Sequence, residues 1–125
     1  MMNSVVKMSG GAAACAEELI ILRAEAIERM GDEEIYREIA HYFAGHLEES
    51  LRDLGEALDR ADTESAGRFA HSMKGNCATV GAEAMRENCL TLEQLCRSGA
   101  LEAARAQYAG MAPKMLALRE VLLAL

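Results

Sequence analysis

The sequence predicts an all-α protein: an up-down-up-down antiparallel four-helix bundle with an additional N-terminal helix. Of the 125 residues, 51% are hydrophobic and only 4% aromatic, with no Trp and one Pro, a composition typical of helical bundles. Apolar residues recur at steps of three and four, and the short loops favour antiparallel neighbours. A coiled-coil oligomer also fits such repeats, but the glycines and an irregular first helix favour the bundle.

The first predicted helix spans residues 12–30. It follows a leader, residues 1–10, that we expect to be flexible. Gly31 suits the position just after this helix, and Asp32 is expected to cap the next one. The chain is long enough for one core, so residues 11–125 are treated as a single domain.

The second predicted helix, about residues 33–60, has the clearest apolar stripe and should run the length of the bundle. We expect the stripe to face the core. It consists of Ile35, Ile39, Phe43, Leu47, Leu51, Leu54 and Leu58.

Two further helices are predicted after the helix that carries His71. The helix over about residues 82–97 is expected to turn Met85, Cys89, Leu92 and Cys96 inward. The last helix begins near Leu101 and carries the stripe Leu101, Ala104, Tyr108, Met111, Met115, Leu118, Leu122 and Leu125. Pro113 interrupts this helix, which predicts a kink or a short break because proline lacks a donor and clashes with the preceding turn.

The third predicted helix has a core face and a wet face. Asp62 is expected to cap it, and Gly81 to follow its end. At about 100° per residue, Met73 and Val80 lie almost opposite His71. These apolar residues, with Phe69, predict that this side is buried and that His71 points into water.

Small residues flank His71 along the wet face. Gly67 lies one turn before it, Gly75 one turn after it, and Ala78 two turns after it. Interior glycines cost about 1 kcal/mol each relative to alanine, so their placement here indicates access for another protein. Lys74 and Arg68 are the flanking cations, three residues after and before His71.

Charge and composition exclude several other functions. The net charge is −7 and no basic stripe is visible, which argues against nucleic-acid binding. No stretch suits a membrane span or a signal peptide, so we expect a cytoplasmic protein that does not engage membranes. The cysteines Cys15, Cys77, Cys89 and Cys96 include no CxxC pair and are interpreted as reduced. Cys89 and Cys96 lie on one helical stripe and are also expected to be buried.

The other histidines do not suggest a metal site. His41 and His46 are five residues apart, which places them about 140° apart around a helix. We expect both to be structural or solvated. No Ser/His/Asp set, phosphate-binding glycine loop or paired catalytic carboxylate is visible either.

One motif resembles that of the histidine-containing phosphotransfer (HPt) domains of two-component phosphorelays. The family pattern is H-x-x-K-G, then five residues and a glycine, and here it reads His71-Ser-Met-Lys74-Gly75-Asn-Cys-Ala-Thr-Val-Gly81. Further likeness lies in Met30-Gly31-Asp32-Glu33-Glu34-Ile35, Leu92-Glu93 and Arg97-Ser98-Gly99-Ala100-Leu101. The resemblance covers roughly residues 15–125 and gains weight from the predicted position of His71 on a bundle surface.

The resemblance implies a phosphocarrier without kinase activity of its own. It assigns His71 as phospho-acceptor, Lys74 as phosphate stabiliser and Gly75 as the position that gives a partner clearance. The implied partners are receiver domains of response regulators or of a hybrid sensor histidine kinase, with the divalent metal on the receiver and no cofactor on this chain. From helix geometry we add Gly67, Arg68 and Ala78 to the docking face.

Two alternatives remain at this point. A helical adaptor could bind a receiver or kinase without phosphoryl chemistry, although the presence of His71 with Lys74 and Gly75 argues against it. An enzyme with its own active site has little support. The identities of donor and acceptor do not follow from the sequence.

Overall fold

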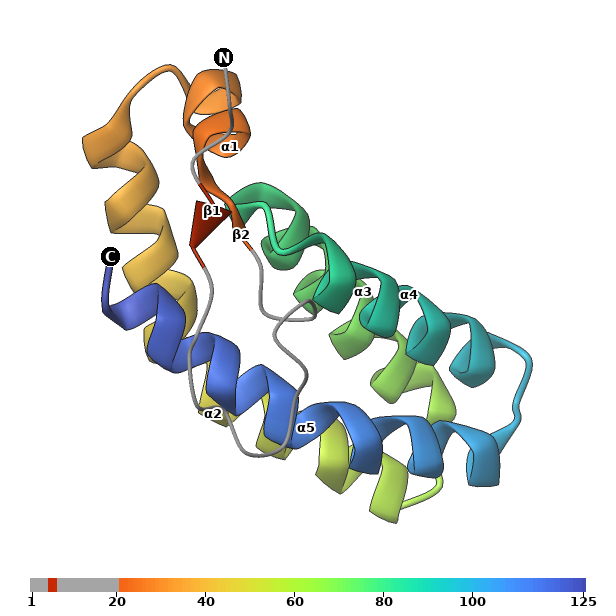
Figure 1. Ribbon diagram of the computed structural model, residues 1–125. Helices are drawn as coiled ribbons and strands as arrows, with labels where there is room; N and C mark the ends of the chain where they lie inside the picture. Colours follow the sequence, from red (N-terminus) through yellow and green to blue (C-terminus); the bar gives the residue numbers. More distant parts are fainter. Residues whose placement is uncertain (1–4, 7–20) are drawn as a thin grey trace.

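The computed structural model describes residues 5–6 and 21–125, which form an all-α bundle with one short β-ladder. Its elements, in chain order, are β1 (Val5–Val6), β2 (Ile21–Leu22), α1 (Arg23–Met30), α2 (Glu33–Asp59), α3 (Thr63–Val80), α4 (Glu83–Arg97) and α5 (Leu101–Leu123). Helices α2 to α5 alternate in direction (Figure 1). Each packs against the next, and α5 returns to α2, so the four enclose one core.

The N-terminal part differs from the prediction. The helix expected over residues 12–30 begins only at Arg23, and Ile21–Leu22 instead forms β2, antiparallel to β1. A tertiary contact overrides local helix propensity here, because the Leu22 N–H donates to the Gly81 carbonyl at 3.0 Å. Residues 12–20 lie outside the described part. Val5–Val6, within the leader that we expect to be flexible, forms β1, and the flexibility of the leader stays a prediction.

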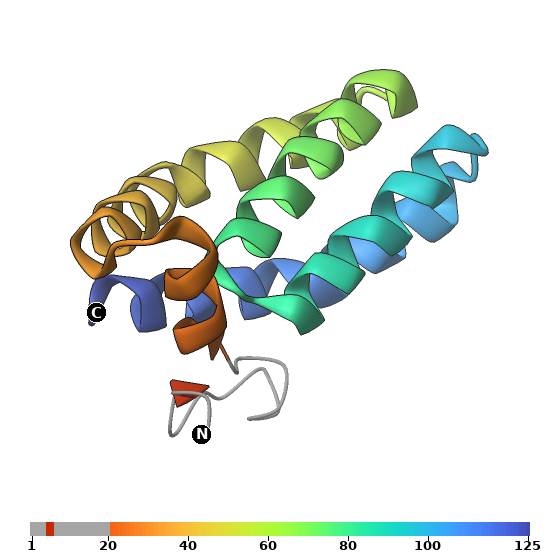
Figure 2. The same ribbon diagram turned by 90° about the horizontal axis from the view of Figure 1, so that it is seen from above.

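Helix α1 closes one end of the bundle. It lies beside the start of α2 and the end of α3 (Figures 1 and 2). Arg29 extends from it to donate to the Ala78 carbonyl at 3.0 Å. The additional N-terminal helix is thus present, but shorter than predicted.

The predicted N-caps are confirmed. The Asp32 carboxylate accepts from the backbone N–H groups of Glu34 at 2.7 Å and Ile35 at 3.1 Å, and Asp62 accepts from Ser65 N–H at 3.0 Å. The hydrogen bonds from Ser65 are the main reason that the pKa of Asp62 lies below its usual value. These carboxylates satisfy donors that helix starts leave unpaired.

Gly81 ends α3 as predicted, and the position requires glycine for two reasons. Its φ is +84°, a left-handed conformation that side chains disfavour. A Cβ there would also lie 2.7 Å from the Leu22 carbonyl oxygen. The reversal into α4 therefore depends on both the turn and the close approach of β2.

The inward face of α2 is rotated at its start relative to the prediction. Ile35 and Ile39 are 46% and 37% exposed, whereas Tyr36 and Ala40 are fully buried. The Tyr36 hydroxyl donates to the Val80 carbonyl at 2.9 Å, which fixes this rotation. Burial raises the pKa of Tyr36 to about 12, against the opposing charge of Arg23, so the hydroxyl keeps its proton. From Phe43 onward the predicted stripe is buried.

The predicted core positions of the later helices are confirmed for the most part. Buried residues include Met73, Val80, Met85, Cys89, Leu92, Cys96, Ala104, Met111, Met115, Leu118 and Leu122. Of the kink or short break predicted at Pro113, the short break is not observed, because α5 continues through this residue. The carbonyl four residues earlier belongs to exposed Ala109, so water can replace the hydrogen bond that proline cannot donate.

Within the described residues, no helix has the length and apolar character to span a membrane.

Candidate functional site

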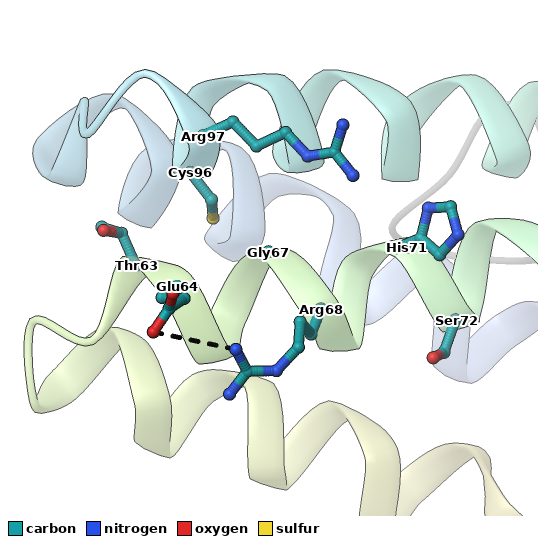
Figure 3. A pocket seen from close by; sticks show the side chains of 8 residues that line it. All are labelled: Thr63, Glu64, Gly67, Arg68, His71, Ser72, Cys96 and Arg97. Carbon is teal, nitrogen blue, oxygen red and sulfur yellow. Dashed lines mark ion pairs between the residues drawn. The ribbon is translucent and has the colours of Figure 1, made fainter.

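His71 lies midway along α3 with its ring on the bundle surface. Its side chain is 60% exposed, while Met73 and Val80 on the other side of the helix are buried. The ring faces α4 across a groove between the two helices (Figure 3). The predicted wet placement of His71 is therefore observed.

A buried carboxylate of α4 gathers the polar side chains around His71. Glu93 is 2% exposed. Its Oε2 lies 2.8 Å from His71 Nδ1 and 2.6 Å from an Arg97 guanidinium nitrogen, and its Oε1 lies 2.7 Å from Lys74 Nζ. One carboxylate thus has three partners from two helices.

These contacts determine the ionisation of Glu93 and the tautomer of His71. Burial alone would raise the pKa of Glu93, but hydrogen bonds from Lys74 and His71 and the charges of Lys74 and Arg97 outweigh burial and hold this pKa below its usual value. Ionised Glu93 can only accept hydrogen bonds, so His71 Nδ1 must be the donor. In the neutral ring the lone pair is then on Nε2, which is the nitrogen free to attack.

Lys74 is placed near His71, as predicted, but it is not free. Its ammonium group pairs with Glu93 at 2.7 Å, and its side chain is 23% exposed. A buried carboxylate requires such a partner, because an uncompensated charge is costly in a protein interior. The first role visible for Lys74 is therefore to hold Glu93, and its role toward phosphate stays a prediction.

The groove beside His71 runs along α3 and α4. Thr63, Gly67 and Arg68 line it from α3, and Cys96 and Arg97 line it from α4 (Figure 3). Arg97 extends along α4 toward His71, with its side chain 70% exposed. The groove therefore gives a partner access to the ring between two arginines.

The predicted docking residues divide into two groups. Arg68 is exposed, contacts Glu64 at 3.8 Å and lines the groove. Gly75 is exposed, and a Cβ there would meet nothing within 4 Å. Both suit a docking face.

Gly67 and Ala78 fit the predicted docking face less well than Arg68 and Gly75 do. Gly67 lines the groove but is buried, and a Cβ there would lie 3.3 Å from the Cys96 Cβ, so its small size mainly allows α4 to pack closely. Ala78 is half-buried, does not line the groove, and its carbonyl accepts from Arg29.

The remaining histidines and cysteines do not assemble a second site. His46 is exposed beside Tyr42, with ring centroids 4.4 Å apart, and His41 is half-buried. Among residues 5–6 and 21–125 there is no group of three side chains that could hold a metal. Cys77, Cys89 and Cys96 are free and buried, which confirms the predicted burial of Cys89 and Cys96. Cys15 lies outside the described residues.

The roles of Glu93 and Arg97 were missed from the sequence. A weak signal exists, because Glu93 follows Cys89 by four residues and adjoins Leu92, both on the inward side of α4. An acidic residue at such a position needs a cationic partner. Which partner it finds depends on how α3 and α4 pack, and helix periodicity alone does not contain that information.

The fold and site define a class: a helical bundle that presents on its surface a histidine oriented by a buried carboxylate. A family model described as the Hpt domain matches residues 38–125, so the chain belongs to the Hpt domain family. This family serves phosphotransfer in two-component signalling, and its members are phosphocarriers rather than kinases. Comparisons with curated proteins and with solved structures gave no match.

Proposed function

We propose that this protein accepts a phosphoryl group on Nε2 of His71 from the aspartate of one receiver domain and passes it to another receiver. Donor and acceptor would be response regulators or a hybrid sensor histidine kinase. The observation that carries this proposal is the exposed His71 ring whose Nδ1–H is held by buried Glu93 at 2.8 Å. The protein would have no kinase activity of its own.

The transfer step uses the orientation that Glu93 imposes. The Nε2 lone pair forms an N–P bond while the P–O bond to the partner's aspartate breaks, and the aspartate leaves as a carboxylate. Because Nδ1 keeps its proton, the ring becomes cationic as the bond forms. The Glu93 carboxylate 2.8 Å away stabilises this charge, as buried carboxylates do for catalytic imidazoles. Return of the group to a second aspartate reverses the step.

Positioning is the main requirement for phosphoryl transfer, and the surface around His71 allows close docking. Gly75 leaves open space one turn beyond the ring, and Arg68 and Arg97 attract the acidic, phosphorylated site of a receiver. The divalent metal would be supplied by the receiver, with no cofactor on this chain. We infer cytoplasmic action on protein partners, without binding of nucleic acid or membranes.

Transfer from a panel of receiver domains, phosphorylated with acetyl phosphate and Mg²⁺, tests the proposal. Wild type should acquire an acid-labile label, and His71→Gln should acquire none while retaining its helical circular dichroism spectrum. Equal labelling of His71→Gln would place the acceptor elsewhere. If the wild type binds receivers but acquires no label, the protein is a helical adaptor and not a phosphocarrier.

A further inference from the structure

Glu93 carries one negative charge beside two cations and an imidazole, and these partners differ in how exposed they are. Lys74 pairs with Oε1 at 2.7 Å, and its side chain is 23% exposed. Oε2 is shared between His71 Nδ1 at 2.8 Å and Arg97 at 2.6 Å. Arg97 is 70% exposed, so it is the partner that can leave at the smallest cost in desolvated charge.

Phosphorylation changes the charge on both sides of Arg97. When Nε2 bonds to phosphorus and Nδ1 keeps its proton, the ring itself carries positive charge next to Oε2. Glu93 then no longer needs Arg97 for neutralisation. The phosphoryl oxygens meanwhile bring negative charge into the groove that Arg97 lines, and a guanidinium binds such oxygens with two parallel hydrogen bonds.

We propose that Arg97 is the cation that binds the phosphoryl group on His71, and that it exchanges Glu93 for phosphate when the group arrives. Lys74 stays on Glu93 and keeps the buried carboxylate ionised. This inference rests on the proposed function and deepens it, because it assigns the phosphate-binding role to a residue of α4 instead of the lysine of α3. Figure 3 shows the Arg97 guanidinium extended toward His71 from the opposite side of the groove.

The equilibrium constant for transfer distinguishes phosphate binding from docking. A residue that only helps the receiver dock changes the forward and reverse rates together, whereas one that stabilises phosphohistidine changes their ratio. The ratio of phosphorylated protein to phosphorylated receiver is therefore measured at equilibrium for wild type, Arg97→Gln, Arg97→Lys and Arg52→Gln. Arg52 is an exposed arginine that lines a separate hollow between α2 and α5, and it serves as the matched control.

Loss of a charge-assisted hydrogen bond should lower the equilibrium constant of Arg97→Gln by about tenfold. Arg97→Lys should recover part of the loss, and Arg52→Gln should match wild type. An unchanged constant for Arg97→Gln, with slower rates in both directions, would reduce Arg97 to a docking residue and overturn the inference. Absence of label on wild type would instead overturn the proposed function, so the two failures are distinguishable.

A spectroscopic measurement follows the exchange itself. The side-chain ¹⁵N resonances of Arg97 should shift on phosphorylation of wild type, and phosphorylation should leave those of Arg52 unchanged. A larger shift of the Lys74 ammonium signal, with Arg97 unmoved, would return the phosphate-binding role to Lys74. Circular dichroism of each variant confirms that the bundle is intact.

Discussion

The helix pairs α3–α4 and α2–α5 share a plan but differ in where their polar contacts end. Each pair has a glycine facing the neighbouring helix: a Cβ at Gly67 would lie 3.3 Å from Cys96 Cβ, and one at Gly55 would lie 2.7 Å from the Tyr108 hydroxyl. Between α3 and α4 the polar contacts join side chains, with Glu93 at their centre. Between α2 and α5 the hydrogen bonds of Tyr108 and Arg105 end on backbone carbonyls, and a longer ion pair joins Arg119 to Glu48 at 3.7 Å.

The α2–α5 hydrogen bonds to backbone carbonyls hold their acceptors in place. The Tyr108 hydroxyl donates to the Leu51 carbonyl at 2.7 Å, and Arg105 donates to the Leu58 carbonyl at 3.0 and 3.2 Å. A backbone carbonyl cannot change charge or move without unfolding a turn, whereas a carboxylate with several partners can exchange one of them. Similar helix packing therefore supports stabilising contacts to the backbone in the α2–α5 pair and a carboxylate with exchangeable partners in the α3–α4 pair.

The largest expected effect is on transfer, from Gly75→Arg. A Cβ at Gly75 meets nothing within 4 Å, so the bundle should keep its stability. The new side chain would hold a receiver away from His71, and displacement of reacting groups by about 1 Å can cost roughly 100-fold in rate. Quench-flow transfer kinetics and urea unfolding measure the two effects. An unaltered transfer rate would remove Gly75 from the docking face.

The matched change Gly55→Arg should do the opposite. Its Cβ would displace the Tyr108 hydroxyl from Leu51, and such overpacking costs about 1–3 kcal/mol of unfolding free energy. Transfer by the folded protein should equal that of wild type, because the substitution lies in the other helix pair. Slower transfer at full stability would contradict the division between the pairs.

A milder test of the α2–α5 pair is Tyr108→Phe. Removing the hydroxyl deletes the 2.7 Å bond to the Leu51 carbonyl and should lower the unfolding free energy by about 1 kcal/mol. The equilibrium constant for phosphoryl transfer should stay at the wild-type value. Chemical denaturation beside the transfer assay checks both, and a shifted equilibrium constant would link the pairs energetically.

The smallest expected effect is the acid dependence of stability. The pKa of Glu93 is lowered in the folded protein, so its contribution is fully present above the unfolded glutamate pKa of about 4.3 and is lost as the pH falls through the folded pKa. Glu93→Gln should therefore show a shallower loss of unfolding free energy below about pH 4.3 than wild type. Tyr108→Phe should parallel wild type. A parallel curve for Glu93→Gln would show that the carboxylate is not stabilised by its partners.

Features encoded by neighbouring residues were predicted well from the sequence. Asp62 and Gly81 mark the ends of α3 because a cap and a left-handed turn need particular residue types. The opposition of His71 and Met73 follows from helix geometry.

Features that depend on contacts between helices were not predicted. The burial of Gly67 follows from how closely Cys96 approaches, and the outward turn of Ile35 follows from the hydroxyl of Tyr36 reaching Val80. The partners of Glu93 depend in the same way on the register of α3 against α4.

The C-terminal end of α3 carries a consequence for repeated use of His71. The carbonyls of Ala78, Val80 and Gly81 accept hydrogen bonds from Arg29 of α1, Tyr36 of α2 and Leu22 of β2, respectively. Three separate elements thus anchor the helix lengthwise at one end, while the groove lies toward the other. In the relay that we propose, a donor and an acceptor would bind this protein in turn, and the anchored helix would present Nε2 of His71 to both in the same position.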